Sequence, residues 1–275
     1  MHKPFGLSIA LSMAMACQVQ SERISNPASR PGPFPSFQYM LTGITAHDDF
    51  INGRPNNISS KTYPYDEQFG SHIVRATPSH VFDATYDPAG KKISLTHTSS
   101  SGEPPIKSIT FTRYVHEANR THRTEYDKTP GPKYGKETAT YRLDFDRQDR
   151  PVLVESSFGE SWRYTYGSSQ HPVTKTETAR FGPEKTYRYQ CGYDSQGRIT
   201  RRVSGSTSEF RYGKHGFIVA TTWAAPGLVE QHRIEHPKID GAGNWLEQEI
   251  YKLENVRGRS KWIPLYKTKR TITYH

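Results

Sequence analysis

A turn-like pattern that recurs along the chain is the feature that most restricts how this sequence can fold. An aromatic or aliphatic residue is followed by Asp, then by Gly three positions later, and then by an apolar residue. The clearest copy is residues 193–199, Tyr-Asp-Ser-Gln-Gly-Arg-Ile. The residues that carry the pattern in the four main copies are Tyr86, Asp87, Gly90, Phe145, Asp146, Tyr193, Asp194, Gly197, Asp240 and Gly243. Recurrence at intervals of about 20 to 30 residues, with weaker copies between, indicates a repeated supersecondary unit.

Each residue type in the pattern has a physical reason for its place. An Asp side chain accepts hydrogen bonds from backbone N–H groups just after it, and Gly supplies the positive φ that hairpin loops require. The aromatic residue ends one strand, and the apolar residue begins the next. Between copies the chain alternates with a period of two, as in residues 186–193. The pattern therefore predicts β-hairpins that stack into an antiparallel meander.

The composition favours the same fold class. Only 33% of the 275 residues are hydrophobic, but 17 are Tyr and 4 are Trp. Large aromatic side chains can form a core in place of Leu, and a basic chain rich in Tyr and Thr suits a sheet with one solvated face. We therefore predict one all-β domain over residues 46–275, a twisted or curved meander. This composition argues against an α/β enzyme core of long apolar parallel strands.

The turns resemble the YD-repeat family, also called Rhs-type repeats, most closely at residues 193–199. The resemblance implies a long, twisted antiparallel sheet that curls into a shell or wraps around a cargo. This chain is shorter than the large members of the family, which favours a small curved sheet. It looks more like the short, lipid-anchored members of bacterial envelopes. The sequence leaves open whether the sheet closes.

Residues 1–16 have the pattern of a secretory signal peptide, with a basic start, an apolar stretch and small residues before Cys17. The cleavage site also resembles a bacterial lipobox, which implies that Cys17 is lipidated and becomes the first mature residue. In a Gram-negative host, Gln18 in the next position implies the outer membrane. Ordinary secretion, with cleavage beside Cys17, is the alternative.

Residues 17–45 are rich in Pro and Ser, and we predict a tether between the membrane and the domain. The chain contains only two cysteines, Cys17 and Cys191. If the Cys17 thiol carries lipid, no intramolecular disulfide can form.

Motifs for catalysis are absent or misplaced. Residues 232–236 fit H-x-x-E-H, but on the expected strand His232 and His236 would lie about 13 Å apart, at ~3.3 Å per residue, too far to share a zinc ion. No nucleophile elbow or glycine-rich phosphate loop occurs. We therefore predict no catalytic residue, no cofactor and no metal site. Paired carboxylates, whose separation only the fold decides, keep an envelope hydrolase as a third alternative.

The chain has a formal charge of +10, and much of it lies near the C-terminus. Between residues 252 and 275 only Glu254 is acidic. The basic residues there are Lys252, Arg257, Arg259, Lys261, Lys267, Lys269 and Arg270. They could contact an anionic partner outside the cytoplasm, such as an acidic protein, a polysaccharide or lipid headgroups. The secretory signal argues against nucleic acid, and a charged edge strand that resists aggregation is the structural alternative.

Together these features predict a non-enzymatic envelope lipoprotein that binds a protein partner or an anionic polymer through its sheet. The alternative is a periplasmic immunity protein that neutralises a secreted toxin, by analogy with the competition systems in which Rhs-type repeats occur. The sequence leaves the partner and the oligomeric state open.

Overall fold

The computed structural model describes residues 53–68, 71–101, 106–129, 135–148, 150–167 and 172–275. The predicted signal peptide (1–16), Cys17 and the whole predicted tether (17–45) lie outside these residues. The described strands are β1 (Pro55–Gln68), β2 (Ser71–Val74), β3 (His80–Tyr86), β4 (Lys92–Ser101), β5 (Ile106–His116), β6 (Arg120–Asp127), β7 (Glu137–Phe145), β8 (Pro151–Ser156), β9 (Ser161–Tyr166), β10 (Pro172–Thr178), β11 (Lys185–Arg188), β12 (Gln190–Tyr193), β13 (Ile199–Ser204), β14 (Ser206–Tyr212), β15 (Ile218–Ala225), β16 (Leu228–Ile239), β17 (Trp245–Val256) and β18 (Arg259–Tyr274). The described part of the chain contains no helix able to cross a membrane.

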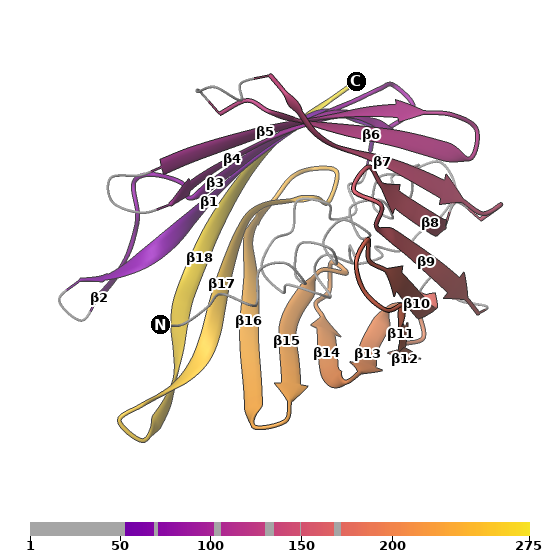
Figure 1. Ribbon diagram of the computed structural model, residues 1–275. Helices are drawn as coiled ribbons and strands as arrows, with labels where there is room; N and C mark the ends of the chain where they lie inside the picture. Colours follow the sequence, from indigo (N-terminus) through magenta and orange to yellow (C-terminus); the bar gives the residue numbers. More distant parts are fainter. Residues whose placement is uncertain (1–52, 69–70, 102–105, 130–134, 149, 168–171) are drawn as a thin grey trace.

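Successive strands pair antiparallel, and the sheet returns to its start because β1 pairs with β3 on one side and with β18 on the other. β11 pairs with β10, and β12 pairs with β13, so these two short strands are successive segments of one stretch. Figure 1 shows the sheet curling from β5–β7 through β8–β12 to β13–β18. The predicted all-β antiparallel meander is confirmed, and the sheet is nearly closed and barrel-like.

Because the strands alternate in direction, the hairpin turns collect at two opposite ends of the sheet. One end, here called the Asp rim, carries the turns between β3 and β4, β7 and β8, β12 and β13, β14 and β15, and β16 and β17. The other end, here called the tip rim, carries the turns between β8 and β9, β10 and β11, β13 and β14, β15 and β16, and β17 and β18. All four main copies of the repeated pattern lie at the Asp rim.

The four copies form the same hydrogen-bonded turn. In each, the Asp backbone N–H donates to the carbonyl oxygen four residues later, at 2.8–2.9 Å. The Asp Oδ1 accepts the backbone N–H of that same residue, at 2.8–3.0 Å. The glycines at the third position have φ of 80° at Gly90, 76° at Gly197 and 86° at Gly243, which L side chains rarely adopt. These aspartates are Asp87, Asp146, Asp194 and Asp240.

A β-bulge follows each turn at the same distance. Tyr193 pairs with Ile199, but Gly192 pairs with Arg201, so Thr200 has no partner in the ladder. The same shift occurs after the β3–β4, β7–β8, β14–β15 and β16–β17 turns. A bulge bends its strand and increases the local twist. Five bulges along one rim give the sheet a physical reason to curl.

An arginine ties two of these turns to the neighbouring hairpin. Arg198 Nε donates to Asp194 Oδ2 at 2.7 Å, and the guanidinium lies 4.3 Å from the centre of the Tyr212 ring. The Tyr212 hydroxyl in turn donates to the carbonyl oxygen of Ile199 at 2.8 Å. The equivalent residues of the β7–β8 turn are Asp146, Arg150, Tyr166 and Pro151. Each turn is thereby joined to the hairpin that follows it.

Tyrosine supplies much of the buried face, as the low Leu content predicts. One cluster of buried apolar side chains connects β7–β9 with β13–β17, and a smaller one spans β1, β3, β4 and β5. The buried tyrosines are Tyr86, Tyr114, Tyr141, Tyr164 and Tyr189. Since the sheet returns to its start, this face is the inside of the barrel-like sheet.

Five basic side chains are buried as well: Lys92, Arg123, Lys175, Arg202 and Arg270. Arg123 lies over the rings of Tyr114 and Tyr141, and it also pairs with Glu125. Lys175 pairs with Glu177. Aromatic faces and carboxylates compensate part of the cost of burying a cation.

We expect loss of the Asp194 carboxylate to destabilise the domain. In Asp194→Ala, the backbone N–H groups of Gln196 and Arg198 lose their acceptor, and so does the Arg198 guanidinium. The free energy of unfolding in urea should fall by about 1–2 kcal/mol. Asp194→Asn, which keeps an oxygen acceptor, should lose less, and Ser195→Ala in the same turn should change it by less than about 0.5 kcal/mol. Equal stability of the Asp194→Ala and Ser195→Ala variants would contradict this role.

Acid should weaken the turns. Partial burial raises the pKa of the turn carboxylates, but hydrogen bonds from backbone N–H groups and a neighbouring side chain outweigh burial and lower the pKa of Asp146, Asp194 and Asp240 below 3.8. A folded-state pKa below the unfolded value stabilises the protein above the unfolded pKa, and that stability is lost as the pH falls through the folded value. Urea unfolding should therefore show stability declining below about pH 4. Replacing all three by Asn should flatten this decline, and an unchanged slope would argue against it.

Candidate functional site

The β17–β18 hairpin ends in a two-residue turn at the tip rim. Arg257 and Gly258 have φ of 52° and 78°, and they separate the paired residues Val256 and Arg259. Positive φ at both central positions is the geometry of a type I′ turn, which favours Asn-Gly. Arg257 is the only non-glycine residue with positive φ in the described part of the chain.

The structure divides the seven predicted C-terminal basic residues into two groups. Lys252 Nζ bonds Glu230 at 2.8 Å, and Lys267 Nζ lies 2.9 Å from Glu249 and 3.2 Å from Glu247. Arg270 is buried with its guanidinium 3.5 Å from the centre of the Trp245 ring. The side chains of these three basic residues are therefore engaged by contacts within the sheet.

The other four are exposed, and none of them forms an ion pair with another described residue. Arg257, Arg259 and Lys261 lie together at the hairpin end, whereas Lys269 lies in the body of β18 opposite Lys61 of β1. Lys261 pairs in the ladder with Glu254, the acidic residue of this segment. The hairpin end therefore has an excess of positive charge at the surface.

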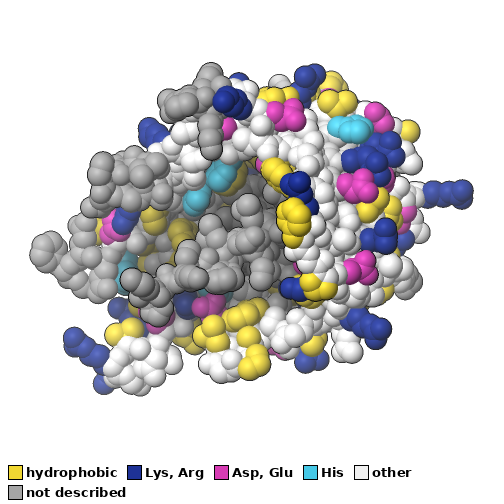
Figure 2. Space-filling model, viewed as in Figure 1, with side chains coloured by type: hydrophobic (Ala, Val, Ile, Leu, Met, Phe, Trp, Pro, Cys, Tyr) yellow, Lys and Arg dark blue, Asp and Glu magenta, His cyan; other side chains and the backbone are white. Residues whose placement is uncertain are grey.

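Exposed apolar side chains lie on other hairpins of the same rim, of which the β15–β16 hairpin is the direct neighbour. Leu228 and Val229 begin β16, and Val229 is 63% exposed. Phe181, between β10 and β11, is 86% exposed. Figure 2 shows hydrophobic side chains at the lower edge beside basic ones, over the β15–β16 and β17–β18 hairpins of Figure 1. The tip rim thus combines positive charge with uncovered apolar surface.

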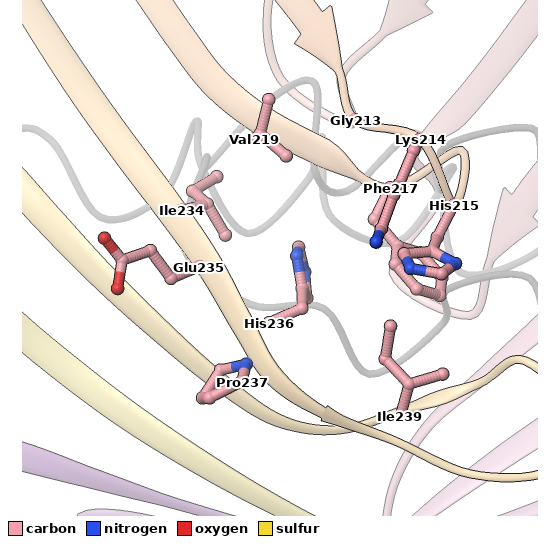
Figure 3. Close-up of a pocket in the computed structure, with 10 residues that line it drawn as sticks. All are labelled: Gly213, Lys214, His215, Phe217, Val219, Ile234, Glu235, His236, Pro237 and Ile239. Carbon is pink, nitrogen blue, oxygen red and sulfur yellow. The ribbon is translucent and has the colours of Figure 1, made fainter.

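A pocket of about 580 Å³ lies at the opposite, Asp rim. Its walls are the β14–β15 turn and the end of β16 (Figure 3). The lining residues are Gly213, Lys214, His215, Phe217, Val219, Ile234, Glu235, His236, Pro237 and Ile239.

His236 is held within a group of rings. Its ring centre lies 5.0 Å from that of Phe217 and 6.0 Å from that of Trp245. The Gln248 amide Nε2 lies 3.1 Å from His236 Nε2, so the amide donates to a neutral imidazole whose own proton is on Nδ1. Burial lowers the pKa of His236 to about 4, with Arg270 and His215 adding to the effect.

A second histidine group lies on the inner face of β3 and β4. The rings of Phe82 and His97 stack with centres 4.0 Å apart, and His80 Nδ1 lies 3.2 Å from His97 Nε2. Burial, followed by the nearby His80, lowers the pKa of His97 to about 4. Both His97 and His236 are therefore neutral in the folded protein at pH 7.

The two histidines of the H-x-x-E-H segment both lie on the extended strand β16. His232 packs near Thr221, while His236 belongs to the pocket. In Figure 3 the Glu235 side chain points away from His236, as alternation along a strand requires. Among the described residues, no three His, Cys, Asp or Glu side chains are gathered as a metal site. Cys191 is half-buried in β12, and burial raises the pKa of its thiol.

Reasoning from the sequence missed the pocket and the buried cations. The H-x-x-E-H segment contains His236, but it suggested a zinc site and not a pocket shared with His215 and Phe217, because the pocket depends on where two strands stop pairing. No tyrosine lies two positions from Arg123 or Lys175 in the sequence, so alternation along their own strands gave no signal for these cations. The predicted turn residues lie at the Asp rim, whereas three of the predicted basic residues, Arg257, Arg259 and Lys261, lie at the tip rim.

No family model and no curated protein sequence matches this chain. Among solved structures, the fold is similar to that of a porin-like protein from Bacteroides uniformis ATCC 8492, with a TM-score of 0.55 and 10% sequence identity. The similarity covers 81% of this chain and 99% of that chain. At this identity the similarity is one of fold alone, and it agrees with the nearly closed antiparallel sheet.

The lowered pKa values of His97 and His236 predict that these two side chains destabilise the fold in mild acid. Unfolded histidine has a pKa near 6.5, so the unfolded chain binds protons first as the pH falls from 6.5 to about 4. Urea unfolding of the wild type should show a loss of stability over this range. His97→Gln and His236→Gln should each reduce the slope. NMR titration of the His236 ring with a midpoint above 6 would contradict the assignment.

Proposed function

We propose that this protein is a non-enzymatic binding protein of the bacterial cell envelope. It is anchored through lipidated Cys17 and engages an acidic protein through the end of the β17–β18 hairpin. The observation that carries the proposal is Arg257, a charged residue in the left-handed conformation at an exposed turn. That conformation costs an L residue roughly 1 kcal/mol relative to Gly. A charged residue that occupies this strained position on an exposed turn is expected to serve an external contact.

The surroundings of Arg257 favour a protein partner. Arg259 and Lys261 extend the positive charge, and Leu228 and Val229 of the adjacent hairpin supply exposed apolar contact area. Apolar side chains flanked by arginine are typical of protein interfaces. An acidic polymer would use the charge but would leave the apolar surface uncovered.

The envelope location follows from the signal-like residues 1–16 and the lipobox-like cleavage site. The resemblance of the turns to YD repeats, with its short lipid-anchored members, agrees with that location. A tethered domain samples partners in the same membrane at high local concentration, so a modest contact surface is sufficient.

The test is retention of an envelope protein by the full chain carrying Cys17→Ser. We expect one acidic protein to bind stoichiometrically and to be released as salt rises from about 0.05 to 0.5 M. The triple variant Arg257→Asn, Arg259→Gln, Lys261→Gln should bind it about tenfold more weakly or worse. Arg113→Gln, Arg188→Gln, Arg211→Gln removes the same charge from exposed sites elsewhere and should bind normally.

The single variant Arg257→Asn separates binding from folding. Asn suits a type I′ turn better than Arg, so thermal stability should be unchanged or higher while affinity falls. Arg257→Lys keeps the charge and should retain affinity. Equal binding by both triple variants, or retention of polysaccharide or anionic vesicles instead of a protein, would overturn the proposal.

A further inference from the structure

We propose that the pocket between the β14–β15 turn and the end of β16 binds a small amphipathic organic anion, with an apolar body and one acidic group. Nothing in the proposed protein contact requires this site. It lies at the Asp rim, whereas the β17–β18 hairpin end lies at the tip rim (Figure 1).

The pocket exists because two neighbouring strands part. The last ladder pair between β15 and β16 is Ala220 with Arg233. Beyond it β16 continues to Ile239, while β15 bends away through a bulge at Val219 into the turn. Pro237 has no backbone N–H to offer a ladder at this point. The separation is therefore built into the register of the sheet.

The walls suit an apolar body. Phe217 and Val219 on one side face Ile234 and Ile239 on the other, and in Figure 3 His236 projects between the two sides. A volume of about 580 Å³ is within the range of small-molecule sites in proteins. The ring of His236, supported by Phe217 and Trp245, offers a flat neutral surface for an aromatic or hydrocarbon group.

The polar groups of the pocket favour an anion. Lys214 and His215 are exposed in the turn, and neither forms an ion pair with another described residue. The carboxylate of Glu235 points away in Figure 3 and lies 3.2 Å from Arg233. From β18, Arg270 stacks behind Trp245 and adds positive charge. The acidic group of a ligand would therefore lie at the turn, against Lys214.

Two fluorescent probes that differ by one acidic group test this. The first is 8-anilinonaphthalene-1-sulfonate, and the second is N-phenyl-1-naphthylamine, which has the same rings without the sulfonate. Both are titrated against the full chain carrying Cys17→Ser in buffer without detergent or lipid. We expect saturable 1:1 binding of the sulfonate, about tenfold tighter than binding of the neutral amine.

Charge variants locate the contact. Lys214→Glu should weaken sulfonate binding about tenfold and leave amine binding unchanged, because it removes the cation at the pocket mouth. Lys238→Glu is the matched control, an exposed residue on the same strand as His236 that does not line the pocket, and it should have little effect. Changes in the NMR signals of the His215 and His236 rings on adding the sulfonate report contact with the pocket directly.

Three results would overturn the proposal: equal affinity for the two probes, equal effects of the two charge variants, or unchanged His215 and His236 signals at saturation. Loss of sulfonate binding in Lys214→Glu with normal retention of the acidic protein would support the pocket and show that the two sites are independent. Failure to retain any protein would bear on the proposed function alone.

Discussion

The hydrogen bonds between the turn aspartates and their own backbone are the constraint on which the structure depends. Each Oδ1 accepts the N–H of the residue four positions later, which sets the length of the turn. The β14–β15 turn has the same backbone hydrogen bond, from Gly213 N–H to the Phe217 carbonyl oxygen, and the same bulge without an Asp. The five-residue turn therefore places the bulge, and the aspartates stabilise that turn in the four main copies. Repetition along one rim accumulates twist, and the accumulated twist brings β18 back to β1.

Because the sheet returns to its first strand, it has an inner face. Tyrosine rings and basic side chains make up much of that face. Tyrosine rings fill the space that Leu would occupy in other sheets, and the stems and cations of Arg123 and Arg202 lie against them. On the outer face, opposite charges meet across strands, as in Arg142 with Glu155 at 2.9 Å. Part of the positive charge therefore lies on buried side chains, so the net charge of the chain overstates the positive charge that a partner can contact.

The two rims differ in the contacts that connect their turns to neighbouring hairpins. At the Asp rim, carboxylates, arginines and tyrosine hydroxyls join one hairpin to the next, and the pocket opens where two of these hairpins part. At the tip rim, turns such as Arg257–Gly258 project without such ties and carry exposed charge and apolar groups. A rim whose hairpins are joined by side-chain contacts suits a small-ligand site. Projecting hairpins suit contact with another protein.

The sequence by itself determined the strands, the antiparallel meander and the position of turns such as that of Asp194 and Gly197. These features depend on hydrogen bonds and φ angles within five residues, which local sequence specifies. Tertiary structure decided the return of β18 to β1, the burial of Arg270 while Arg257 stays exposed, and the pocket beside His236. Each of these depends on which strand lies next to a residue and where its pairing stops. The pairing of β1 with β18 joins residues more than 200 positions apart, and no spacing pattern in the sequence predicts it.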